Sequence, residues 1–181
     1  MLGNESIWDV ASQCHDVLAQ AAIPHAIIGG LAVCLHGYPR NTVDLDLLIR
    51  SESQAAVRTA LEGAGYSWSA EAAEFRSPAG IPVQFMFGLD RAGPGSEVRF
   101  PDPADDTVVM FVEGLPVLTL AKLIESKLAC GESNLRRTHK DFADVVELIA
   151  KHNLSCEFAR QLHKSLRNTF RDLVLRTRGM S

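Results

Sequence analysis

Residues 42–49 limit the possible fold most strongly, because they alternate side chains of different character and carry two carboxylates. Successive side chains of a strand point to opposite faces of a sheet, so the alternation predicts a strand with one apolar face. The apolar set is Val43, Leu45, Leu47 and Ile49, and the opposite set is Thr42, Asp44, Asp46 and Leu48. Asp44 and Asp46 would then share a face, with Cα atoms roughly 6.5 Å apart.

Two neighbouring carboxylates repel each other and each resists removal from water. Between Thr42 and Leu48 the chain offers no Lys or Arg that would neutralise them. A bound Mg²⁺, which prefers carboxylate oxygens, would balance Asp44 and Asp46. The alternative is a polar edge strand exposed to water, and a D-x-D pattern alone does not exclude it.

A glycine pair precedes this strand and strengthens the cation hypothesis. The short apolar run 25–28 is typical of a strand, and it ends at Gly29-Gly30. Glycines between a strand and a helix let the backbone come close to a phosphate group. Without the carboxylates, the pair would indicate only a tight turn.

The remaining patterns predict an α+β chain with strands in front and helices behind. Expected helices cover 7–22, 31–35 and 52–62, the last with Ser51 as N-cap, and expected strands cover 73–77, 81–87, 107–112 and 115–118. Residues 89–106 are rich in Gly, Pro and Asp and predict a long surface loop. From Thr119 onward three apolar stripes have helical spacing, and the third contains Phe158, Leu162, Leu166 and Phe170. We therefore expect a single compact unit, in which residues 1–118 form the main domain and a helical segment, 119–181, packs on it.

The composition excludes several classes of protein. With 181 residues, 46% hydrophobic and 22% charged, the chain is neither collagen-like nor disordered. No apolar run reaches the roughly 20 residues that cross a bilayer, and the N-terminus lacks a signal-peptide pattern. Its four cysteines show no metal-ligand spacing. We expect a cytoplasmic protein with reduced thiols and no membrane partner.

Two blocks of sequence together resemble a known superfamily. The first is Gly29-Gly30-x13-Asp44-x-Asp46; the second is Lys127-Leu128-Ala129 followed by Arg137 and Lys140-Asp141-x-x-Asp144. This order resembles the nucleotidyltransferase superfamily with the DNA polymerase β-like palm, over roughly residues 23–150. Within it, the chain looks most similar to small bacterial abortive-infection and toxin-type nucleotidyltransferases.

The resemblance implies a palm of mixed sheet and flanking helices, followed by the helical segment. It also implies transfer of a nucleoside monophosphate from a Mg²⁺-bound nucleoside triphosphate to an acceptor hydroxyl or phosphate. Asp44 and Asp46 would bind the metal, and the implied catalytic set is Asp44, Asp46, Lys127 and Gln84. The implied nucleotide-binding set is Gly29, Gly30, Arg40, Thr42, Lys127 and Asp141.

Two basic residues have structural alternatives to these roles. Lys127 lies on the inward edge of its expected helix and needs an anionic partner, which is either a phosphate or Asp141 in an ion pair. Arg40 could contact a phosphate or the acceptor, although an exposed loop arginine is the simpler interpretation.

One position departs from the family pattern. These enzymes often carry a third carboxylate on a later strand, and Gln84 occupies the corresponding place in 81–87. An amide neither accepts a proton near neutral pH nor adds negative charge for a metal. Glu74 on the preceding strand would compensate only if it faced the same way.

The sequence leaves the acceptor and the oligomeric state open. Toxin-like kinship favours RNA, a tRNA end or a cognate partner protein, and residues from Glu157 onward carry six basic against two acidic side chains, which would suit RNA. A resemblance to aminoglycoside and lincosamide nucleotidyltransferases favours a small hydroxylated acceptor. Gln84 favours a third possibility, a catalytically weak nucleotide-binding or antitoxin-like module.

Overall fold

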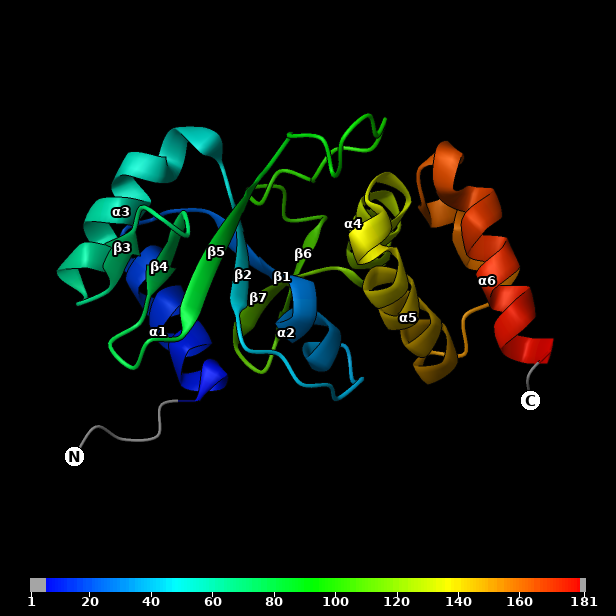
Figure 1. Ribbon diagram of the computed structural model, residues 1–181, viewed down its shortest axis with the longest axis horizontal. Helices are drawn as coiled ribbons and strands as arrows, with labels where there is room; N and C mark the ends of the chain where they lie inside the picture. Colours follow the sequence, from blue (N-terminus) through cyan, green and yellow to red (C-terminus); the bar gives the residue numbers. More distant parts are fainter. Residues whose placement is uncertain (1–5, 180–181) are drawn as a thin grey trace.

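The computed structural model describes residues 6–179, which form a seven-stranded mixed sheet with helices on both sides and a helical C-terminal segment (Figure 1). The strand order is β3-β4-β5-β2-β1-β7-β6. The strands are β1 (His25–Ile28), β2 (Leu45–Ile49), β3 (Ser67–Ser69), β4 (Glu74–Arg76), β5 (Pro82–Phe87), β6 (Val109–Val112) and β7 (Leu115–Leu118). This architecture confirms the expected α+β fold class, a mixed sheet with flanking helices followed by a helical segment.

The helices and 3-10 turns alternate with the strands at first and then follow one another. They are α1 (Ile7–Gln20), α2 (Gly29–Leu35), η1 (Ser51–Ser53), α3 (Gln54–Gly63), α4 (Leu120–Ser133), α5 (Leu135–Lys151), η2 (Cys156–Gln161), η3 (Lys164–Leu166) and α6 (Arg167–Gly179). Figure 1 shows α1 and α3 on one side of the sheet and α2, α4 and α5 on the other. The expected boundary between 118 and 119 falls between β7 and α4.

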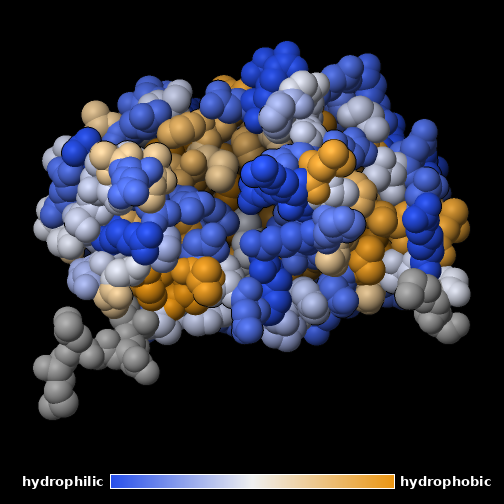
Figure 2. All heavy atoms as spheres, viewed as in Figure 1, coloured by the Kyte–Doolittle hydropathy of each residue, from blue (hydrophilic) through white to orange (hydrophobic). Residues whose placement is uncertain are grey.

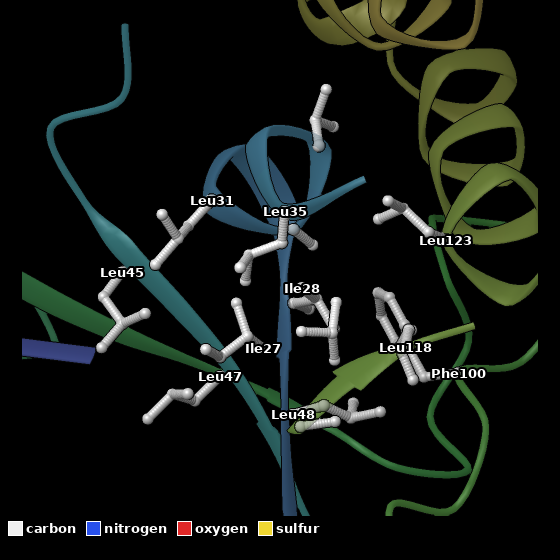
Figure 3. Close-up of a cluster of buried hydrophobic side chains, with 14 of the residues drawn as sticks. Ile27, Ile28, Leu31, Leu35, Leu45, Leu47, Leu48, Phe100, Leu118 and Leu123 are labelled. Carbon is white, nitrogen blue, oxygen red and sulfur yellow. The ribbon is translucent and has the colours of Figure 1, made fainter. Parts of the chain in front are cut away.

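Apolar side chains from both sides of the sheet form the core. Figure 3 shows Ile27 and Leu47 on adjacent strands, with Leu31 and Leu35 of α2 above the sheet and Leu123 of α4 at its side. All five side chains are buried. Removing such side chains from water is the main favourable contribution to folding, and it fixes α2 and α4 against the central strands.

The central strands place the acidic segment in the middle of the sheet. β2 pairs antiparallel with β1, so that Ile28 stands beside Asp46, and parallel with β5, so that Asp46 stands beside Gln84. All five residues of β2 are buried. The exposed edge strand that was the alternative for this segment is therefore wrong.

Three expectations for local structure need correction. The strand predicted over 42–49 begins only at Leu45, and Asp44 lies in a bend just before it. Ser51 is not the N-cap of α3, since it opens the 3-10 turn that leads into the helix. The stripe from Phe158 to Phe170 does not form one helix, because its residues are divided among two 3-10 turns and α6.

The strand Ser67–Ser69 was not predicted, because three residues without apolar alternation leave no recognisable pattern. Among residues 6–179, no helix is long and apolar enough to cross a membrane.

Candidate active site

Asp46 lines a cleft between the sheet and the helices α4 and α5. The cleft is lined by Gly29, Asp46, Lys127, Arg137 and Asp141, together with the apolar side chains of Ile28, Met86, Phe100 and Leu123. Figure 2 shows hydrophilic residues along the middle of the same face as Figure 1, where the sheet meets α4 and α5. The two sequence blocks, about 80 residues apart in the chain, thus come together at one cleft.

The Asp46 carboxylate is buried, with 8% of the residue exposed, and it lacks a partner. Within residues 6–179 no group donates a hydrogen bond to this carboxylate, and no Lys or Arg forms an ion pair with it. Burial, together with the nearby charge of Asp44, raises the pKa of Asp46 to about 6, against the opposing charges of Arg137 and Lys127. An unpaired carboxylate in this position favours a bound cation.

Gly29 allows the chain to pass directly beside Asp46. A Cβ built on Gly29 would lie 1.9 Å from Asp46 Oδ2, and the backbone of Gly29 has φ +66°, which side chains rarely tolerate. The sequence predicted a turn at the glycine pair. In the structure, Gly29 and Gly30 are instead the first two residues of α2. Any residue other than glycine at position 29 would displace the carboxylate.

Gly30 fits against the loop that leads into β2. A Cβ on Gly30 would lie 2.5 Å from Thr42 Oγ1 and 2.6 Å from Arg40 Nη2. The Thr42 hydroxyl in turn donates to Asp44 Oδ1 over 3.2 Å. The two glycines thus let the loop 40–44 approach α2 and hold Asp44 next to Asp46.

Arg40 is not an exposed loop arginine, since only 17% of its side chain is accessible. Its Nε lies 3.0 Å from Asp144 Oδ1 on α5, and its Nη1 donates to the carbonyl of Asn41. Arg40 therefore links the loop before β2 to the helical segment, a contact that the sequence did not indicate.

Lys127 has the structural partners that the sequence left open. Its Nζ lies 3.2 Å from Asp141 Oδ1 and 2.7 Å from Asp144 Oδ2, and all three residues are buried. Lys140, which is spaced to pair with Asp144, forms no ion pair with it within 6–179; Asp144 binds Lys127 and Arg40. Because Lys127 and Asp141 also line the cleft, an ion pair with Asp141 and a contact with phosphate are compatible.

Arg137 entered the sequence analysis only as a member of the second block, without a role in the site. It lines the cleft, its Nε lies 3.8 Å from Asp141 Oδ2, and 48% of its side chain is exposed. Its neighbour Arg136 does not line the cleft. The signal that could have identified Arg137 is its spacing of four residues before Asp141, which puts both on one helix face.

Gln84 occupies the predicted place beside Asp46, and Glu74 lies next to Gln84 on the neighbouring strand β4. Gln84 Nε2 donates to Glu74 Oε2 over 2.9 Å, while Glu74 Oε1 lies 2.5 Å from Arg76 Nη2. Glu74 does face the same way as Gln84, but it is 4% exposed and both of its oxygens have partners. It is therefore not a free carboxylate.

The described part of the chain holds no group of three His, Cys, Asp or Glu side chains that could bind a metal. Asp44 and Asp46 are two carboxylates that neighbour each other and form no ion pair within residues 6–179. Such a pair can hold a hard divalent cation only together with other oxygen ligands, such as phosphate groups and water. Beside it stand the positive charges of Lys127 and Arg137, which can bind an anionic ligand.

Comparison with known proteins supports one family. A family model described as Aminoglycoside-2″-adenylyltransferase matches residues 11–145 of the chain. A search of curated proteins found no match to this chain.

Solved structures share the fold at low sequence identity. A putative nucleotidyltransferase from Thermotoga maritima is 20% identical, with TM-score 0.53, over 76% of this chain and 92% of that one. The structure of ANT(2″)-Ia in complex with adenylyl-2″-tobramycin is 14% identical, with TM-score 0.52, over 90% of this chain and 95% of that one. A putative nucleotidyltransferase from Helicobacter pylori is 16% identical, with TM-score 0.50, over 93% of this chain and 81% of that one.

Proposed function

Because this chain belongs to the Aminoglycoside-2″-adenylyltransferase family, within the nucleotidyltransferase superfamily, we propose that it transfers a nucleoside monophosphate from a nucleoside triphosphate to an acceptor hydroxyl or phosphate. The observation that carries the proposal is the buried Asp46 carboxylate, which has no partner in the described part of the chain and lines the same cleft as Lys127 and Arg137. Negative and positive groups so arranged suit a metal–polyphosphate ligand.

Mg²⁺ fits the donor set of this site. Asp44 and Asp46 would hold it, since both offer carboxylate oxygens and neither is engaged by a basic side chain. When bound, Mg²⁺ supplies neutralisation of the negative charge on the phosphate oxygens. The protein contributes two charged ligands, so the triphosphate and water would complete the coordination.

The other site residues bind and orient the nucleotide. Gly29 leaves room for the Asp46 carboxylate and Gly30 leaves room for Thr42 and Arg40, so the acidic loop lies close to the start of α2, where the triphosphate would bind. Lys127 and Arg137 bring positive charge to its phosphates. Thr42, Arg40 and Asp141 position their neighbours: Thr42 holds Asp44, Arg40 ties the loop to α5, and Asp141 holds Lys127.

The transfer exchanges one bond to phosphorus for another. An acceptor oxygen forms a bond to the α-phosphorus, the bond to the bridging oxygen breaks, and pyrophosphate leaves. The acceptor hydroxyl loses its proton to water, because the amide of Gln84 has no basic group near neutral pH and Glu74 is doubly hydrogen-bonded.

For the acceptor, we favour a small hydroxylated molecule of the aminoglycoside type. The description of the matching family model supports this choice. A specific observation keeps RNA as a second candidate. The segment from η2 to α6 carries exposed Arg160, Lys164, Arg176 and Arg178, and basic side chains contact phosphate backbones. A cognate protein is a further acceptor that the toxin-like kinship suggests.

The experiment incubates the protein with Mg²⁺ and each α-labelled nucleoside triphosphate in turn. Separate reactions contain a panel of aminoglycosides, total RNA with tRNA, or the proteins of a cell extract. We expect label on an aminoglycoside or a related polyol, and none after Asp46→Asn. Asp16→Asn is the matched control, because Asp16 is an exposed aspartate of α1. Label on RNA or protein alone would refute the aminoglycoside-type acceptor and identify the labelled class as the acceptor instead. Saturable nucleotide binding without transfer would refute the enzymatic proposal.

A further inference from the structure

Arg76, Glu74 and Gln84 form a chain of hydrogen-bonding groups that leads toward Asp46. Arg76 Nη2 donates to one oxygen of Glu74, and Gln84 Nε2 donates to the other over 2.9 Å. Gln84 stands beside Asp46 in the register of β5 and β2. Because the three residues from Glu74 to Asp46 lie on neighbouring strands, a change at Glu74 can reach the site through the amide.

The carboxylate of Glu74 determines which way the amide faces. An ionised carboxylate accepts hydrogen bonds and cannot donate them, so Gln84 must turn its NH₂ group toward Glu74. The carbonyl oxygen leaves the same carbon in another direction, so it faces away from Glu74. On β5, Gln84 shares its sheet face with Met86, two residues further on, which lines the cleft with Asp46.

We propose that Glu74 is a positioning residue that turns the Gln84 carbonyl oxygen toward Asp46, where this oxygen serves as a neutral ligand of the divalent cation. The inference rests on the proposed function for the presence of the cation. An amide oxygen is a known ligand type for Mg²⁺, although it contributes no charge. The position that carries a third carboxylate in similar enzymes thus keeps an oxygen donor, with its direction fixed from the neighbouring strand.

An isosteric substitution separates this role from a purely structural one. In Glu74→Gln, Arg76 still requires an acceptor, so the introduced amide turns its oxygen to Arg76 and its NH₂ group to Gln84. Gln84 must then present its own oxygen to that NH₂ group and turn its NH₂ group toward Asp46. The variant keeps the size of the side chain but places a donor where the cation needs an oxygen.

Mn²⁺ is the probe, and the loss of its free electron paramagnetic resonance signal measures binding without any nucleotide. We expect Glu74→Gln to weaken Mn²⁺ binding by roughly 10-fold, a typical effect for residues that orient a ligand. In a Gln84→Leu background, Glu74→Gln should cause no further loss, since no amide remains to be oriented. The reciprocal exchange, Glu74→Gln with Gln84→Glu, matches every donor with an acceptor and should bind Mn²⁺ more tightly than the wild type.

Glu71→Gln is the matched control, because it removes the same charge from an exposed residue three positions away. An equal loss from Glu74→Gln with and without Gln84→Leu would show that Glu74 acts through its charge alone, and it would overturn the inference. So would unchanged Mn²⁺ binding by a folded Glu74→Gln variant, or no binding by the wild type. If Glu74→Gln fails to fold, as judged by circular dichroism, the reciprocal exchange decides: binding no tighter than the wild type refutes the proposal.

The labelling reaction separates this inference from the proposed function. If the protein transfers nucleotide but Glu74→Gln binds Mn²⁺ as tightly as the wild type, only the positioning role is refuted. The expected Mn²⁺ affinities without transfer to any acceptor would refute the proposed function alone.

Discussion

Gly29 and Asp46 approach each other so closely that a Cβ on the glycine would stand 1.9 Å from Oδ2 of the aspartate. The contact joins the start of α2 to the middle of β2, and it explains why both sequence features occur together. The glycine contributes the space that the carboxylate occupies. The first prediction tests this relationship directly.

Gly29→Ala is expected to abolish nucleotidyl transfer, because the methyl group would displace the Asp46 carboxylate. The left-handed backbone, with φ +66°, adds a cost of roughly 1–2 kcal/mol to the folded state. Transfer assays and urea unfolding measure the two effects. Gly63→Ala is the control, because nothing lies within 4 Å of a Cβ there. Full activity in Gly29→Ala would show that the close approach has no functional role.

The raised pKa of Asp46 predicts how stability depends on pH. Burial raises this pKa from 3.8 to about 6, so the folded protein binds the proton more tightly than the unfolded chain. The resulting contribution to the free energy of unfolding is fully present below pH 3.8 and is lost as the pH rises through about 6. Above this window the ionised carboxylate costs up to about 3 kcal/mol, at 1.36 kcal/mol for each pKa unit.

Asp46→Asn should therefore raise the free energy of unfolding near pH 8 by about 1–3 kcal/mol, with a gain that shrinks toward pH 4. Urea unfolding across this range measures it, with Asp16→Asn as the exposed control. Added Mg²⁺ should stabilise the wild type near pH 8 and leave Asp46→Asn unaffected. A variant less stable than the wild type near pH 8 would contradict the unpaired state of the carboxylate.

Lys127→Met is expected to destabilise the fold strongly. The substitution would leave the buried carboxylates of Asp141 and Asp144 without their shared ammonium group. Such a loss typically lowers the free energy of unfolding by about 3–5 kcal/mol. Chemical unfolding gives the value. Arg58→Met is the comparison, since the Arg58–Glu62 pair has about half of each side chain exposed and contributes less than about 1 kcal/mol. Similar losses in the two variants would argue against a buried network.

Arg137→Met should weaken the binding of the nucleotide without unfolding the protein. Arg137 lines the cleft but remains half exposed, so its loss removes a phosphate contact and little packing. A hydrogen bond to a charged group contributes about 1.5–3 kcal/mol, so KM for the nucleotide should rise by roughly 10- to 100-fold. Arg136→Met is the matched control on the exposed surface. Equal KM values for the two variants would exclude Arg137 from nucleotide binding.

The sequence was sufficient for elements that leave a local pattern. β1 has the predicted bounds, and β5, β6 and β7 lie within the predicted strands, because their apolar runs end at turn residues. The C-terminal segment was predicted less well. The stripe from Phe158 to Phe170 has helical spacing, but the chain satisfies it with short turns that pack Ala159, Leu162 and Leu166 against the helices.

The same division holds for the candidate site. Alternation along 42–49 predicted a strand face shared by Asp44 and Asp46, but β2 begins only at Leu45, so strand geometry does not place Asp44; the bend before the strand does. No pattern predicted that Arg40 pairs with Asp144, because these residues lie 104 positions apart. The position of Glu74 was equally hidden, since the sequence does not tell which face of a three-residue strand turns toward β5.

Thus the sequence by itself determined the chemistry that the chain carries: two carboxylates in strand spacing, a glycine pair before them, and a basic-acidic block on a helix. Only the tertiary structure decided which of these groups have partners. Lys127 and Arg40 bind buried carboxylates from distant segments, Gln84 is held by Glu74, and Asp46 has no hydrogen-bond or ion-pair partner among residues 6–179. Pairing depends on distances between segments far apart in the chain, and these are set when the core packs α2 and α4 on the central strands.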